Sequence, residues 1–110
     1  MKKKLSEYKL SDADAQAILA ALPLVLLVEA DSDEQYDFNE VCCELAASKL
    51  IAKSNSFTAN EFRVIYASVA LANQYLSGQL ALDVTAEEKA VLKKHLFTYI
   101  KLEKALGPSA

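Results

Sequence analysis

Apolar residues recur at spacings of three and four along most of this chain, and this spacing is typical of helices that bury one face. The clearest row follows Thr58 and comprises Phe62, Ile65, Val69, Ala72 and Leu76. Two further rows comprise Phe38, Val41, Cys42, Leu45 and Ala52, and Leu92, Leu96, Tyr99 and Leu106. Together with the apolar run 17–28, these rows predict four helices that share one core, over residues 12–28, 33–53, 59–77 and 86–106.

Each predicted helix begins at the same chemical pattern, a Ser or Thr followed three residues later by Asp, Glu or Gln. The hydroxyl can accept a hydrogen bond from an unpaired backbone N–H of the first turn, and the later side chain can reach back to the cap. The four pairs are Ser11–Asp14, Ser32–Gln35, Thr58–Glu61 and Thr85–Glu88. At the opposite ends, Gly78 and Gly107 fit helix C-termini at which glycine takes the left-handed conformation.

Pro23 interrupts the first predicted helix, because proline lacks the backbone N–H and clashes with the preceding turn. This helix is therefore either kinked or split in two at Pro23. Short connections place consecutive helices antiparallel, so we predict an all-α fold, an up-and-down antiparallel bundle of four or five helices. The bundle forms a single domain over residues 11–107, with an N-terminal arm over 1–10 and a C-terminal tail over 108–110.

The composition supports one helical core and argues against charged partners. Of 110 residues, 53% are apolar, and the two Gly and two Pro are too few turn formers for a small β-sandwich. The net charge of −3 gives no general attraction for nucleic acid or an anionic membrane, so we expect neither as a partner. The run 17–28 is shorter than the roughly 20 residues of a membrane-spanning helix. We expect a cytoplasmic protein, and the alternative is secretion with residues 1–30 as a signal peptide.

The residues that usually carry catalysis or metal binding are few. Cys42 and Cys43 are adjacent and cannot join distant elements, so we interpret them as reduced thiols. His95 is the only histidine, and a nucleophile pair with either cysteine would require the second and fourth predicted helices to present them together. The acidic segment 29–44 imitates a calcium loop but has Tyr36 where that loop needs Gly. We therefore predict no enzyme activity, and no catalytic, cofactor or metal-binding residues.

The width of the apolar rows indicates association, because a single small core has difficulty covering all of them. We predict a protein that acts through protein–protein interaction, as a homodimer. The candidate interface residues are Leu24, Leu27, Val64, Leu71 and Tyr75. Two alternatives stay open: a carrier that holds a small apolar ligand in a cavity of the bundle, and a regulatory or immunity-type protein that neutralises a partner.

Overall fold

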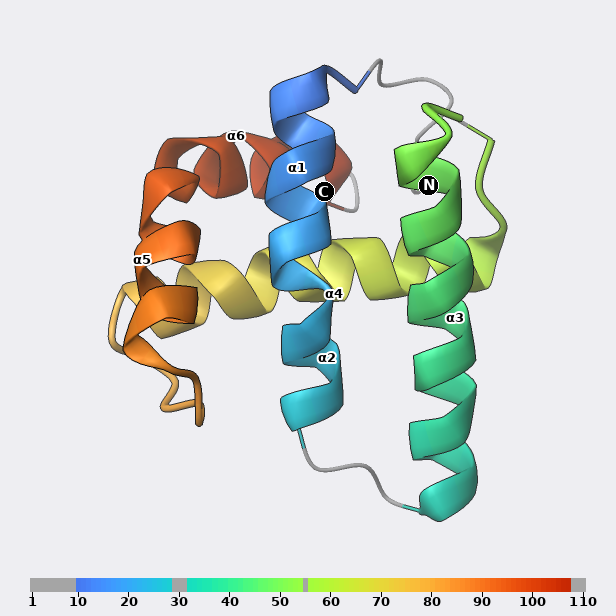
Figure 1. Cartoon of the computed structure of the whole chain (residues 1–110), viewed down its shortest axis with the longest axis horizontal. Coiled ribbons are helices and arrows are strands. Elements are labelled where there is room, and N and C mark those ends of the chain that lie inside the picture. Colours follow the sequence, from blue (N-terminus) through green and yellow to red (C-terminus); the bar gives the residue numbers. More distant parts are fainter. Residues whose placement is uncertain (1–9, 29–31, 55, 108–110) are drawn as a thin grey trace.

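The chain is entirely helical over the part that the computed structural model describes, residues 10–28, 32–54 and 56–107. Six helices follow one another in this part: α1 (Asp12–Ala21), α2 (Pro23–Leu27), α3 (Asp33–Ile51), α4 (Ala59–Leu76), α5 (Ala86–Lys94) and α6 (Leu96–Leu106) (Figure 1). The prediction of an all-α fold is confirmed. Within the same ranges, no helix is both long and apolar enough to cross a membrane. Most of the predicted arm and all of the predicted tail lie outside the described residues.

The predicted helix starts are confirmed at all four positions. At Ser11, Thr58 and Thr85 both hydrogen bonds of the capping box form, so each hydroxyl accepts from the third helical N–H while that residue's carboxylate accepts from the cap N–H. At Ser32 the hydroxyl accepts from the backbone N–H of Gln35. These contacts lie within one turn, which explains why the sequence alone locates them.

The helix ends follow the prediction at one glycine and depart from it at the other. Gly78 follows α4 with a φ of 83°, the left-handed conformation expected of a terminal glycine. Gly107 has φ −62° and ψ 159°, so the left-handed conformation predicted there is wrong and the chain leaves α6 extended. After α3 the left-handed position is taken by Lys53, with a φ of 60°.

Two breaks divide the long helices of the prediction. Pro23 splits the first into α1 and α2 and occupies the first position of α2, where its missing N–H leaves no hydrogen bond unmade. The second break, at His95, was not predicted, so a single helix over 86–106 is wrong. The backbone N–H of His95 donates to the Leu92 carbonyl three residues back, and the tightened turn redirects the chain. As a result, α5 and α6 run in different directions in Figure 1, and each of them packs on both α1 and α4.

The helices do not form the regular up-and-down bundle that was predicted. Figure 1 shows α1 and α2 end to end with α3 alongside them, while α4 lies across all three. The cause is the wide buried surface of α4, which contacts α1, α2, α3 and α6 and therefore has no single neighbour to follow. Its fully buried side chains are Val64, Ile65, Ser68, Val69 and Ala72. Residues 79–84 connect α4 to α5 without forming a helix or strand, and Leu82 and Val84 pack on the core.

Three polar side chains inside the core connect one helix to another, whereas the buried Ser68 hydroxyl donates to the Ile65 carbonyl of its own helix. The Tyr99 side chain is fully buried, and its hydroxyl donates to the Ala17 carbonyl at 2.8 Å, which joins α6 to α1. Asp14 and Glu61 are also buried, and Lys101 and Lys49 from other helices donate to them at 2.8 and 2.6 Å. Burial raises the pKa of Glu61, but hydrogen bonds from Lys49 and Thr58 outweigh it and leave this pKa below its usual value.

Candidate interaction surface

Three large apolar side chains form a row on the outer surface of α3. Val41 and Leu45 are 52% and 50% exposed, and Phe38 is exposed to a similar degree. Because these residues are three and four positions apart, they share one face of the helix. We call Phe38, Val41 and Leu45 the α3 stripe.

The sequence prediction placed Phe38, Val41 and Leu45 in the core, and their exposure shows that this prediction is wrong. The face of α3 that packs against α2 and α4 instead carries mostly small side chains, Cys42, Cys43, Ala46 and Leu50. Small residues allow helices to approach closely, so the row of small side chains turns inward and the larger row stays outside. The sequence does contain a sign of this surface, because α3 has more apolar residues than one buried face needs. It does not indicate which of the two adjacent rows is buried.

The N-terminal end of the α3 stripe is held by α4. The Arg63 guanidinium lies 5.9 Å from the centre of the Phe38 ring, and its Nη2 donates to the Asn39 Oδ1 at 2.8 Å. A guanidinium over an aromatic ring is attracted to the ring face. The contact with Arg63 therefore helps to hold the Phe38 ring at the surface.

The α3 stripe lies in an acidic environment. The exposed carboxylates of α3 are Asp33, Glu34, Asp37, Glu40 and Glu44. Lys49 in the last turn of α3 pairs with Glu61, and Lys53, just beyond the helix, pairs with Asp12. The surface of α3 therefore combines apolar side chains with excess negative charge.

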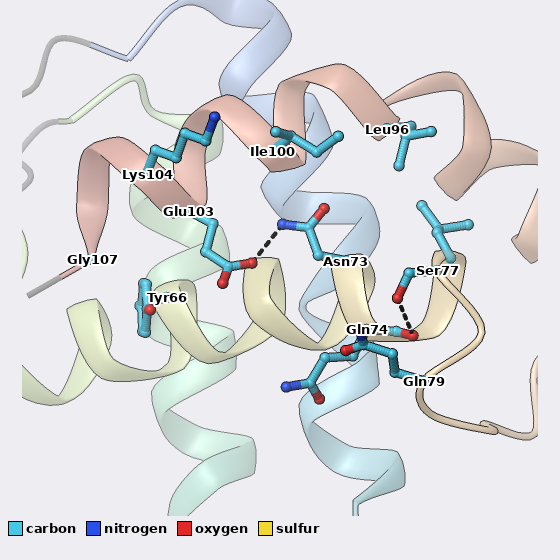
Figure 2. Close-up of a pocket in the computed structure, with 11 residues that line it drawn as sticks. Tyr66, Asn73, Gln74, Ser77, Gln79, Leu96, Ile100, Glu103, Lys104 and Gly107 are labelled. Carbon is cyan, nitrogen blue, oxygen red and sulfur yellow. Dashed lines mark hydrogen bonds between the residues drawn. The ribbon is translucent and has the colours of Figure 1, made fainter.

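A groove of about 910 Å³ lies between α4 and α6 (Figure 2). Its apolar lining comes from Leu76, Leu96 and Ile100. Between the two helices, the amide nitrogen of Asn73 donates to the Tyr99 carbonyl at 3.0 Å and to the Glu103 carboxylate at 2.6 Å. These bonds connect the two walls, and Asn73 and Glu103 themselves line the groove.

The residues predicted to form an interface do not lie on one surface. Leu24 and Val64 are buried in the core, 3% and 0% exposed. Leu71 and Tyr75 are partly buried, and the Lys89 ammonium lies 5.8 Å from the centre of the Tyr75 ring. Only Leu27 of the five is classed as exposed. A docking surface in this protein is therefore better sought on α3.

The cysteines and the histidine are not brought together. Cys42 and Cys43 lie on α3, while His95 is at the junction of α5 and α6, on the opposite side of the molecule in Figure 1. The His95 ring packs edge-on to Tyr99, with 6.1 Å between ring centres. In the described ranges, no three His, Cys, Asp or Glu side chains gather in a way that could hold a metal ion.

We expect Cys43 to react slowly with thiol reagents while the protein is folded. Burial, and to a lesser extent Cys42, raises its pKa from 9.0 to about 11, which lowers the reactive thiolate fraction about 100-fold at neutral pH. A Cys42→Ala variant retains the larger contribution, that of burial, so Ellman's reagent should modify its Cys43 more than about tenfold more slowly in buffer than in urea. Equal rates in the two solutions would contradict the burial of this thiol.

Comparison of the chain with protein families, with curated proteins and with solved structures finds no match.

Proposed function

We propose that this protein is a non-catalytic interaction module that associates with further copies of itself through the α3 stripe. The observation that supports the proposal is the row of three half-exposed large apolar side chains on one helix face. Single exposed apolar residues are ordinary, whereas a contiguous row is typical of association surfaces. The smallest assembly of this kind is a homodimer.

The distribution of charge supports a second copy as the partner. The exposed acidic residues of α3 contrast with the exposed lysines of the last two helices, Lys89, Lys93, Lys94, Lys101 and Lys104. Copies of one chain can therefore bring opposite charges together, which favours specific association. The net charge of −3 conceals this separation, because it sums the two regions.

We expect the Leu45→Asp variant to lose self-association while it stays folded. The substitution places a charge in the centre of the α3 stripe, where docking would have to remove it from water. Sedimentation velocity from micromolar to millimolar protein should show association for the wild type, and a dissociation constant at least about tenfold higher for the variant.

The matched control is Val91→Asp on α5, since Val91 has a similar exposure of 43% but lies away from α3. It should associate like the wild type. Circular dichroism should show the same helix content and similar melting for all three proteins. A wild type that remains monomeric throughout, or a Leu45→Asp variant that associates normally, would overturn the proposal.

A further inference from the structure

We infer that the α3 stripe of one copy docks in the α4–α6 groove of another copy. This inference rests on the proposed self-association and adds the surface that receives the stripe. The contact then joins two different surfaces, the stripe of one copy and the groove of the next.

The shapes and the apolar side chains of the two surfaces match. The α3 stripe is a convex row with spacings of three and four, and a helix that docks in a groove usually does so through such a row. The groove offers Leu76, Leu96 and Ile100 between two helices. Three residues before Ile100, Phe97 is 84% exposed and extends the apolar surface along α6.

The charges of the two surfaces are also complementary. Asp37 lies four residues before Val41 and Glu44 three residues after it, so both carboxylates are neighbours of the α3 stripe on the helix surface. Lys104 lines the groove, and in Figure 2 its side chain points away from Glu103, whose carboxylate accepts from Asn73. An incoming acidic helix would therefore meet a lysine at the edge of the groove.

Direct packing of one α3 stripe on another is the competing arrangement. It would place the acidic flanks of both copies, including Asp37 and Glu44, in one contact. Arg63 over Phe38 offsets part of this charge, but Asp37 and Glu44 of both copies would still meet, which disfavours association, whereas the groove adds Lys104. The charge pattern thus favours the groove over a stripe-to-stripe contact.

A contact between two different surfaces has a consequence for assembly size. After one contact, one copy still has a free groove and the other a free stripe, so further copies can add. The wild type therefore forms a closed ring if the last copy meets the first, and an open chain if it does not. A pair of variants that each retain only one of the surfaces should stop at two copies.

The test mixes two variants that are each damaged on one surface. Leu45→Asp keeps the groove, and Ile100→Asp keeps the stripe; Ile100 is 41% exposed, so the substitution leaves the core intact. Each variant alone should remain monomeric in sedimentation velocity. Their equimolar mixture should form a one-to-one dimer with a dissociation constant within about tenfold of the wild-type value.

The outcomes separate this inference from the proposed function. If Ile100→Asp associates like the wild type, or if the mixture stays monomeric while the wild type associates, the groove is not the receiving surface and only the inference fails. If the wild type never associates, both fail. Should Ile100→Asp not fold, Lys104→Glu replaces it in the same mixture, since Lys104 is exposed and its reversal opposes the acidic stripe. Val91→Asp is the control, because it changes neither the stripe nor the groove. It should associate like the wild type in sedimentation velocity.

Discussion

Replacing Tyr99 by alanine is expected to destabilise the protein by about 3–5 kcal/mol, the usual range for removing a large aromatic side chain from a core. Tyr99 is the largest fully buried side chain of the described residues. Its removal leaves a cavity where α6 meets α1 and also removes the hydrogen bond to the Ala17 carbonyl. Domains of this size are stable by only about 5–15 kcal/mol, so the variant should melt at a much lower temperature.

The matched variant is Tyr99→Phe, which keeps the ring and removes only the hydroxyl. Its expected cost is about 1 kcal/mol, the typical net contribution of one hydrogen bond. Burial raises the pKa of Tyr99, so the hydroxyl stays protonated at ordinary pH and this cost should not change between neutral and mildly alkaline solution. Urea unfolding measures both variants. An alanine variant no less stable than the phenylalanine variant would show that the ring is not in the core.

Replacing Lys49 by methionine is expected to cost about 2–3 kcal/mol at neutral pH. Removing one partner of a buried ion pair usually costs about 3–5 kcal/mol, because the remaining charge is buried without compensation. Here the Glu61 side chain is only 5% exposed, but Lys49 is 34% exposed, so water already screens part of the interaction and the lower value follows.

The pH dependence of this loss identifies its cause. In the wild type, the pKa of Glu61 lies below its usual 4.5 in the folded state, so the pair contributes stability above about pH 4.5 and loses it as the pH falls through the folded-state pKa. Without Lys49, the effect of burial on the Glu61 pKa is less opposed, so this pKa rises. As the pH falls, Glu61 of the variant is therefore protonated before that of the wild type, and the variant no longer buries an unpaired charge. The difference in unfolding free energy between the two proteins should therefore shrink as the pH falls below about 5.

Lys53→Met is the control for Lys49→Met. Lys53 also pairs with a carboxylate, Asp12, but at 3.6 Å and with about three quarters of both side chains exposed. Exposed pairs contribute about 0–1 kcal/mol, so this variant should unfold almost like the wild type at every pH. Equal losses for the two lysines, or a loss at Lys49 that does not vary with pH, would contradict the interpretation of Glu61 as a buried, paired carboxylate.

The sequence was most informative where the deciding contacts are local. A capping box needs only residues three apart, so Ser11, Thr58 and Thr85 located three helix starts, and Pro23 located a break for an equally local reason. Gly107 shows the limit of this reasoning, because a terminal glycine permits the left-handed conformation without requiring it.

The parts that were not predicted depend on which helices meet. The break at His95 lies inside a regular apolar row, and it turns the chain so that both α5 and α6 pack against α1 and α4. The choice between the two rows of α3 depends on how closely α2 and α4 approach, which favours Cys42 and Ala46 over Val41 and Leu45. Apolar spacing predicts that a row exists, but two adjacent rows on one helix satisfy it equally. The candidate surface was therefore assigned to the core, and Leu24 and Val64 were assigned to the surface.

The buried carboxylates of the capping boxes have a consequence for cooperativity. Asp14 and Glu61 each close the first turn of their own helix and also bind a lysine of another helix, so one carboxylate makes a local and a long-range contact. The first turn of α1 and its contact with α6 should consequently form and melt together, and likewise α4 with α3. Glu88 provides the internal contrast, because it is exposed and its cap bonds stay within its own first turn. In hydrogen exchange, we therefore expect the first turn of α5 to open independently, whereas those of α1 and α4 open with the rest of the molecule.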